Sequence, residues 1–183
     1  SEKIALDLPP SIRVERIGPT QTLARMLAEG EIDALYTARA PSSFRARDGR
    51  VRRLFADYGR VEREYYRTTG IFPIMHVVAL RRDVYEANRW IAQSLYKALV
   101  EAQRCVYEDF HETAALKAML PWLVEHVEEA EALMGPDFWP YGLERNHATL
   151  ATFLRYSHEQ GLSKRQLTPE ELFAPETLDA FVI

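Results

Sequence analysis

The first part of the chain alternates strand-like and helix-like patterns. Over residues 12–17, apolar residues nearly alternate with charged ones, which is typical of a half-buried strand. Residues 21–29 place apolar side chains at helical spacing, and Thr20 or Thr22 can cap the start of this helix. Residues 32–36 are mostly apolar, as in a short strand that is covered on both faces. The order strand, helix, strand predicts a βαβ unit with parallel strands.

The second part of the chain is predicted to be mostly helical. It follows residues 70–80, a long run of β-type residues. Apolar residues at helical spacing predict helices over part of residues 54–66 and over residues 90–110, 112–120, 122–134 and 146–159. Thr168 and Pro169 have the pattern of a capped helical turn near the end of the chain. We therefore expect an α/β lobe segment at residues 1–80 and a helical return segment with a C-terminal tail at residues 81–183.

The composition is that of an ordinary globular chain. Of the 183 residues, 47% are apolar and 27% are charged, which argues against disorder. The formal net charge is −4, and basic and acidic residues are intermixed, so the sequence has no basic patch of the kind that binds nucleic acid or anionic membranes. No apolar run reaches the length of a transmembrane helix. We expect neither nucleic acid nor a membrane among the partners.

The chain has one cysteine, Cys105, so no disulfide can form within it. Cys105 falls in the helical stretch at residues 90–110, and we interpret it as a small buried hydrophobic residue rather than a reactive thiol. The first residues, Ser1 to Lys3, do not resemble a signal peptide. Because a single cysteine cannot form a disulfide within the chain, the cysteine content gives no information about an oxidising compartment.

The loop at residues 37–44 carries candidate binding groups. It follows the second predicted strand, and ligands of open parallel sheets bind outside the carboxyl ends of the strands. Thr37, Ser42 and Ser43 supply hydroxyls to this loop, and Arg39 supplies a guanidinium. A solvated turn explains the same pattern, because Ser and Thr often cap turns and arginine often forms surface ion pairs.

Six short stretches, spread over nearly the whole chain, match sequence strings of one known family in the same order. They are GEIDALY at residues 30–36, ARAPS at 38–42, GIFPIMHVV at 70–78, SLYKA at 94–98, FWPYGL at 138–143 and LTPEELF at 167–173. In these stretches the chain resembles the 4,5-dihydroxyphthalate decarboxylase family, which shares the type 2 periplasmic-binding-protein fold. The resemblance implies an α/β clamshell with a helix-rich C-terminal half. It also implies that this clamshell is incomplete, with an upstream lobe segment absent.

The resemblance implies a carboxy-lyase that removes carbon dioxide, without a cofactor, from an aromatic dicarboxylate with two phenolic hydroxyls, as in phthalate catabolism. Such chemistry needs a cation for the spectator carboxylate, an acceptor for a phenolic proton and an acid for the ring carbon. Arg39 suits the first task, because its planar fork can bind a carboxylate through two N–H groups. His76 suits the second or the third, because imidazole gains and loses protons near neutral pH. A lone histidine on an apolar strand is also common as a core residue.

Five further residues are assigned to substrate binding. Thr37, Ser42 and Ser43 are candidate hydroxyl donors. Trp139 and Tyr141 can stack on an aromatic ring, and packing at the end of the lobe is the alternative explanation for them. Histidines and carboxylates do not have zinc-ligand spacing in the sequence, so no metal is expected.

A second function class remains open at this stage. The same fold serves non-catalytic solute-binding proteins of ABC transporters, here for an aromatic acid or a similar small anion, and fold alone does not decide. Arg39 serves both functions, whereas His76 favours chemistry. The decarboxylase interpretation places the protein in the cytoplasm and the transporter interpretation places it in the periplasm. We expect a small aromatic carboxylate as ligand, leave a homo-oligomer open, and expect the 183 residues alone to be inactive.

Overall fold

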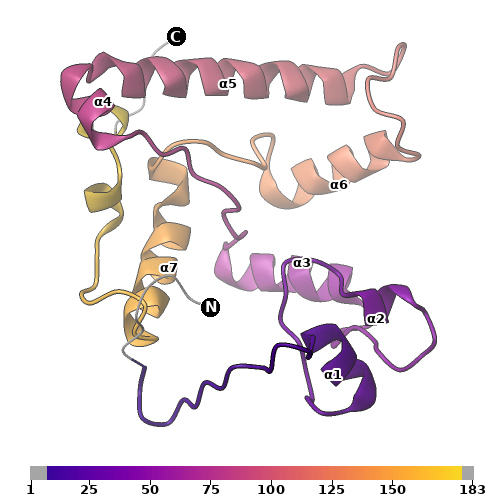
Figure 1. Cartoon of the computed structure of the whole chain (residues 1–183). Helices are drawn as coiled ribbons and strands as arrows, with labels where there is room; N and C mark the ends of the chain where they lie inside the picture. The colour runs from indigo at the N-terminus through magenta and orange to yellow at the C-terminus, as the bar shows by residue number, and fades with distance from the viewer. Residues whose placement is uncertain (1–7, 179–183) are drawn as a thin grey trace. The chain divides into compact units, whose positions relative to one another are not determined.

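The computed structural model describes residues 8–178, and Figure 1 follows the chain through them. The chain divides into two compact units, Ser1–Glu64 and Tyr65–Ile183. The boundary falls inside helix α3, Tyr58–Thr69, whereas the sequence pattern changes character near residue 80. The assignment of residues 1–80 and 81–183 to lobe segments of a clamshell stays a prediction.

The first unit is built around two short helices that contact each other, α1 at Leu23–Glu29 and α2 at Ser42–Arg45. Thr22 caps α1, because its hydroxyl accepts a hydrogen bond from the backbone N–H of Arg25 at 3.3 Å. Gly30 ends the helix with φ 76°, a conformation that glycine adopts without steric cost. The predicted helix over residues 21–29 and one of its two predicted caps are confirmed.

The first unit has no buried residue among residues 8–64. Large apolar side chains are open to solvent, among them Val14, Leu54 and Phe55. Apolar side chains gain stability when they leave water, at roughly 25 cal/mol per Å². The first unit therefore offers apolar surface that its own residues do not cover.

The three segments predicted as strands are not paired with one another. Residues 12–17, 32–36 and 70–80 contain no strand in the described part of the chain. A β-strand takes its ladder hydrogen bonds from a neighbouring strand, so a β-type sequence pattern cannot form a strand without a partner. The incomplete clamshell stays a prediction, since its sheet is not formed within residues 8–178.

The second unit is helical. After α3 come α4 at Arg82–Ala87, α5 at Trp90–His111, α6 at Leu123–Met134, η1 at Glu144–Asn146, α7 at His147–Glu159, η2 at Pro169–Leu172 and η3 at Pro175–Thr177. The long helix α5 contacts α4, α6 and η3, while α7 contacts η1 and η2 (Figure 1). The predicted helices over residues 90–110, 122–134 and 146–159 are confirmed. Within the described residues, no helix has both the length and the apolar character needed to cross a membrane.

A small apolar core lies within the second unit. Buried residues include Ala92, Leu123, Val127, Leu143, Leu150 and Leu154. They come from α5, α6 and α7 and from Leu143, which precedes η1. The C-terminal segment is tied to the same unit, because the Tyr85 hydroxyl donates to the Glu176 carboxylate at 2.7 Å. Burial of one face of each helix explains why these helices form where their sequence periodicity predicts them.

Two sequence expectations in the second unit are wrong. Residues 112–120 are not helical. The Glu112 carboxylate accepts the N–H groups of Ala114 at 2.7 Å and Ala115 at 3.3 Å, and this local turn competes with helix continuation. Cys105 is exposed rather than buried, because it lies on the face of α5 that carries the ion-paired residues Glu101 and Glu108.

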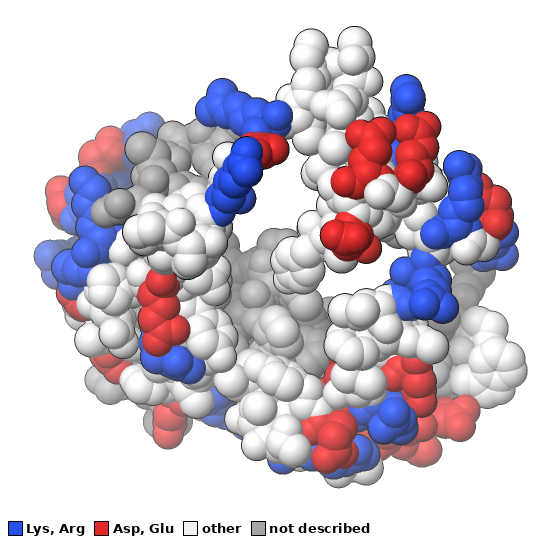
Figure 2. Space-filling model, turned by 90° about the horizontal axis from the view of Figure 1, so that it is seen from below, with Lys and Arg blue, Asp and Glu red and all other residues white. Residues whose placement is uncertain are grey.

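Charged side chains of both signs are interspersed on the molecular surface. On the face shown in Figure 2, Lys and Arg lie between Asp and Glu, in keeping with the balanced composition. Many of them form exposed ion pairs, such as Arg25 with Glu29 at 2.8 Å. Exposed pairs of this kind contribute only about 0–1 kcal/mol each, so these charges solvate the surface and do little to hold the fold together.

A histidine lies at the contact between the end of α5 and α6. Nδ1 of His111 lies 2.7 Å from the backbone oxygen of Tyr107, and Nε2 lies 3.0 Å from the Glu131 carboxylate. Both ring nitrogens thus face acceptors, which favours the doubly protonated ring. The Tyr107 carbonyl, followed by Glu131, raises the pKa of His111 above its ordinary value of 6.5.

We expect the stabilising effect of His111 to be fully present below pH 6.5 and to be lost as the pH rises through the raised pKa of the folded state. The thermal midpoints of the native chain and His111→Gln should therefore differ more at pH 6, below the ordinary pKa, than at pH 9. A difference that grows with pH would contradict this assignment. Glu125→Gln, an exposed acid in the first turn of α6, serves as the control.

Candidate functional site

The loop before α2 holds Arg39 in an exposed turn. The Thr37 hydroxyl accepts the backbone N–H of Arg39 at 3.3 Å and donates to its carbonyl at 3.2 Å. This short turn occupies the Thr37 hydroxyl, so the capping explanation for Thr37 holds. The Arg39 guanidinium forms no ion pair or hydrogen bond within the described residues. The expected alternative, a surface ion pair, is not formed within residues 8–178, and the guanidinium is available to an anion.

Ser42 and Ser43 lie on a shallow hollow between α1 and α2. The hollow has a volume of about 330 Å³ and is lined in part by both serines, Arg25, Glu29 and Arg50. The Ser43 hydroxyl is buried and has no hydrogen-bond partner within the described residues. A buried hydroxyl without a partner costs about 1–3 kcal/mol, so the first unit is destabilised slightly at Ser43.

The arginines near this hollow are already engaged. Arg50 makes a two-pronged contact with the Asp48 carboxylate, at 2.9 Å through Nε and 2.6 Å through Nη2. This contact lowers the pKa of Asp48 and raises the pKa of Arg50. Arg53 lies 4.4 Å from the ring centre of Tyr58 and 5.2 Å from that of Phe44, as a cation held between two aromatic rings. Compared with these two arginines, Arg39 is the better placed to bind an anion.

His76 is exposed in the extended segment before α4. Its ring makes no hydrogen bond within the described residues. The alternative explanation for this residue, a satisfied core histidine, finds no support within the described residues. Of the two predicted catalytic residues, Arg39 belongs to the first unit and His76 to the second.

The aromatic loop, residues 138–143, lies beside the segment that carries His76. The ring of Phe72 contacts the ring of Trp139 edge-on, with ring centres 5.4 Å apart and an angle of 62° between the ring planes. Phe72 precedes His76 by four residues in the same extended segment. The contact brings together two of the sequence stretches that carried the family resemblance. Trp139 is 44% exposed and Tyr141 is 40% exposed, so both rings remain accessible.

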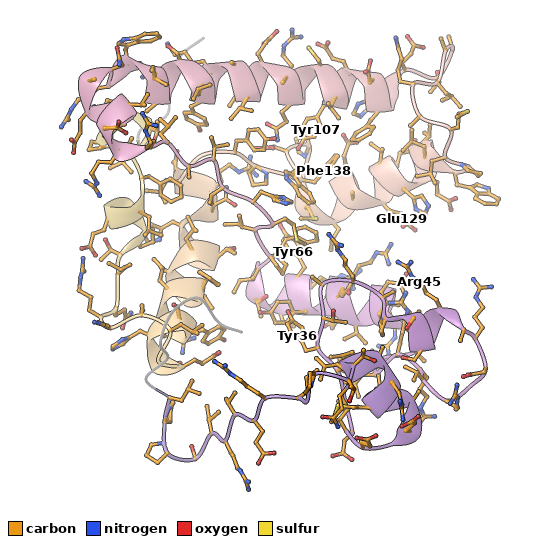
Figure 3. The ribbon with its side chains drawn as sticks, viewed as in Figure 1. Tyr36, Arg45, Tyr66, Tyr107, Glu129 and Phe138 are labelled. Atoms are coloured by element: carbon orange, nitrogen blue, oxygen red, sulfur yellow. The ribbon has the colours of Figure 1, made fainter. Side chains whose placement is uncertain are left out.

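Sequence reasoning missed the residues of α5 that hold this loop. The Tyr107 hydroxyl accepts the backbone N–H of Trp139 at 2.9 Å, and the side chain of Gln103 donates to the backbone carbonyl of Trp139. Figure 3 shows Phe138 next to Tyr107, and their ring centres lie 4.9 Å apart. The spacing of Gln103 and Tyr107, one helical turn apart on α5, is the only signal that the sequence contained.

Burial changes the acidity of the tyrosines around the loop. Burial raises the pKa of Tyr107, and the N–H of Trp139 opposes part of this rise. Burial also raises the pKa of Tyr96, with help from the negative charge of Asp137. Both phenols therefore stay protonated over the physiological range and serve as neutral hydrogen-bonding groups. Within residues 8–178, no group of three His, Cys, Asp or Glu side chains is arranged to hold a metal ion.

Comparison with known proteins gives two relatives of the same kind. The chain is 36% identical over 182 residues to a 4,5-dihydroxyphthalate decarboxylase from Comamonas testosteroni, in an alignment that covers 100% of this chain and 55% of the relative. A 4,5-dihydroxyphthalate decarboxylase from Pseudomonas putida is 42% identical over 66 residues, which are 36% of this chain and 26% of that relative. No protein-family model matches the chain.

The chain thus spans about half the length of the Comamonas testosteroni protein. The similarity extends over the whole chain, so it includes all six stretches from which the resemblance was drawn. The predicted resemblance to the 4,5-dihydroxyphthalate decarboxylases is confirmed.

Proposed function

We propose that this chain forms part of a carboxy-lyase that removes one carboxylate from 4,5-dihydroxyphthalate. The observation that carries the proposal is the 36% identity to a 4,5-dihydroxyphthalate decarboxylase over the full length of the chain. Identity at this level along 182 residues supports a shared activity as well as a shared fold. The activity is a proposal for the whole polypeptide, because the chain aligns with 55% of the relative.

The proposed reaction uses the substrate's own hydroxyls as electron donors. In 4,5-dihydroxyphthalate each carboxylate lies para to one hydroxyl. Electron donation from that hydroxyl makes the ring carbon that bears the carboxylate nucleophilic, and an acid delivers a proton to this carbon. The bond to the carboxylate then breaks, its electron pair restores the aromatic ring, and carbon dioxide leaves. The product is a dihydroxybenzoate, and the reaction consumes one proton at carbon, so it requires no oxidant and no reductant.

Arg39 is proposed to bind the spectator carboxylate. Its guanidinium is exposed and makes no ion pair within the described residues, and the turn made by Thr37 fixes the backbone from which it projects. A guanidinium and a carboxylate form two parallel charge-assisted hydrogen bonds, which orient the ring as well as hold it. Ser42 and Ser43 are proposed as neighbouring hydroxyl donors, and the Ser43 hydroxyl has no partner in residues 8–178.

His76 is proposed to move the proton, either from the phenol or to the ring carbon. Its ring is exposed and uncommitted within the described residues, so both nitrogens are free to exchange protons with a substrate. In the second unit the rings of Phe72 and Trp139 contact each other, and Tyr141 follows Trp139 in the same loop. These rings are proposed to contact the aromatic ring of the substrate.

The proposed fold is an incomplete type 2 periplasmic-binding-protein-like clamshell. Residues 12–17, 32–36 and 70–80 are proposed to become strands when they pair with polypeptide that corresponds to the remaining length of the relatives. Hydrogen exchange tests this point. The backbone N–H groups of residues 74–80 should be protected in the full-length gene product and exchange freely in the 183-residue chain. Equal exchange in both proteins would contradict the proposed sheet.

Release of carbon dioxide from 4,5-dihydroxyphthalate by the full-length gene product tests the proposed function. Phthalate without hydroxyls is the matched control, because it has no para electron donor and should release nothing. Binding of 4,5-dihydroxyphthalate without release of carbon dioxide would contradict the proposed enzyme activity and favour a solute-binding protein. A cytoplasmic location is proposed with the enzyme, and a cleavable signal peptide in the gene would contradict it.

A further inference from the structure

Side chains of helix α5 hydrogen-bond both the backbone N–H and the backbone carbonyl of Trp139. Its N–H donates to the Tyr107 hydroxyl at 2.9 Å, and its carbonyl accepts from the side chain of Gln103. Gln103 and Tyr107 are separated by one turn of α5, and their side chains lie 3.4 Å apart. Hydrogen bonds to both the N–H and the carbonyl of one residue fix the position and the direction of the loop at Trp139.

The flanking residues hold the loop as well. The Tyr107 hydroxyl donates to one oxygen of Asp137 at 3.2 Å, while Arg145 holds the other oxygen at 3.0 Å. On the far side of Trp139, the Asn146 amide donates to the carbonyls of Pro140 at 2.7 Å and Gly142 at 2.8 Å. The loop is therefore anchored before, at and after Trp139.

Gly142 adds a steric reason for this loop conformation. Its φ is 88°, and a Cβ at this position would lie 3.1 Å from Cζ of Tyr96 and closer still to its hydroxyl oxygen. Only glycine combines this backbone angle with so close an approach to α5. The loop is thus packed directly against the helix, and its backbone has little freedom to rearrange.

The rings of the loop are nevertheless accessible. Trp139 is 44% exposed and Tyr141 is 40% exposed, although the backbone of their loop is held by four hydrogen bonds to side chains of α5 and η1 and by glycine geometry. The Trp139 ring has an edge-on neighbour in Phe72, which limits its side-chain rotation. A loop that served only packing would bury these rings, whereas a rigid backbone with open aromatic faces is suited to bind a flat ligand.

We propose that Gln103 and Tyr107 are positioning residues that hold Trp139 as a binding surface for the flat ring of an aromatic carboxylate. This inference rests on the proposed function and deepens it. The two α5 side chains touch the backbone of Trp139 rather than the ligand. They reduce the conformational freedom that Trp139 loses on binding, so their contribution is to substrate affinity.

The test uses the full-length gene product and 4,5-dihydroxyphthalate, with binding followed by quenching of tryptophan fluorescence. Tyr107→Phe keeps the ring contact with Phe138 and removes the oxygen that accepts the Trp139 N–H. We expect it to raise KM and the midpoint of the titration by about tenfold and to change kcat by less than about twofold. Gln103→Ala should also raise KM and the titration midpoint, so the result does not depend on a single variant.

Two controls isolate the effect. Tyr156→Phe removes a hydroxyl from a 43% exposed tyrosine of α7 and should leave KM unchanged. Trp139→Phe should remove most of the ligand-induced quenching, while Trp122→Phe, which alters a tryptophan outside this loop, should retain it. The near-ultraviolet circular dichroism of each variant reports whether the fold is intact.

The outcomes separate the inference from the proposed function. A native protein that neither binds nor decarboxylates 4,5-dihydroxyphthalate overturns the proposed function and this inference with it. A native protein that is active, with Tyr107→Phe and Gln103→Ala showing native KM, overturns only the inference. Equal losses in kcat and stability without a change in KM would make these residues structural, and would also overturn it.

Discussion

Replacing His76 with alanine is expected to lower kcat by about 10²–10⁴-fold while the affinity for 4,5-dihydroxyphthalate stays within about threefold of the native value. The physical reason is that a proton carrier acts on the reacting atoms, and its loss raises the barrier without removing a binding contact. His76 is exposed and has no partner within the described residues, so its removal leaves no buried group unsatisfied. Turnover and binding are measured separately, by carbon dioxide release and by equilibrium titration.

The matched control for His76 is His126→Ala, which removes an exposed histidine of α6 in the same unit. It should retain native turnover. An equal loss of turnover in both variants, or native turnover in His76→Ala, would remove His76 from the mechanism. His76→Gln adds a second check, because it keeps hydrogen-bonding capacity but cannot exchange a proton near neutral pH.

Replacing Arg39 with alanine is expected to weaken binding of 4,5-dihydroxyphthalate about 10- to 100-fold, since charge-assisted hydrogen bonds contribute about 1.5–3 kcal/mol and every 1.4 kcal/mol is tenfold. Arg39 makes no ion pair within the described residues, so the loss measures its contact with the ligand. KM and the titration midpoint should rise together. Arg39→Lys should recover part of the affinity, because an ammonium keeps the charge without the two-pronged geometry.

Arg45→Ala is the matched control for Arg39. Arg45 is an exposed arginine in the last turn of α2, in the same unit, and its loss should leave the affinity unchanged. If Arg45→Ala and Arg39→Ala weakened binding equally and slightly, the effect would reflect general electrostatic attraction rather than a binding site. Raising the salt concentration separates the two cases, because long-range attraction is screened whereas a close ion pair is screened much less.

Local patterns in the sequence were sufficient to predict most helices. The apolar periodicity of residues 90–110 predicted α5 to within a residue, and Thr22 capped α1 as one of the two predicted caps. These features depend on side chains within one or two turns of each other, which a single sequence contains in full. The helix predicted at residues 112–120 is not formed, because the Glu112 carboxylate accepts two nearby backbone N–H groups. Apolar periodicity gives no sign of such a side-chain competitor.

The strand predictions depend on a different kind of information. Residues 12–17, 32–36 and 70–80 have β-type patterns but contain no strand in the described residues. A helix satisfies its own backbone hydrogen bonds, whereas a strand needs a partner that comes from elsewhere in the polypeptide. The sequence pattern therefore predicts which segments are able to form a sheet, and the sheet itself depends on the partner.

The sequence by itself determined most of the longer helices, the candidate residues Arg39 and His76, and the likeness to the 4,5-dihydroxyphthalate decarboxylases, but not the short helix α2 within the predicted loop. Only the tertiary structure placed Phe72 against Trp139 and fixed the Trp139 backbone between Gln103 and Tyr107. These contacts join residues about 30 to 70 positions apart, and helical or strand periodicity extends over only a few turns. Packing of α5 against the aromatic loop decided them, because burial and hydrogen bonding act between residues that meet only in the folded chain.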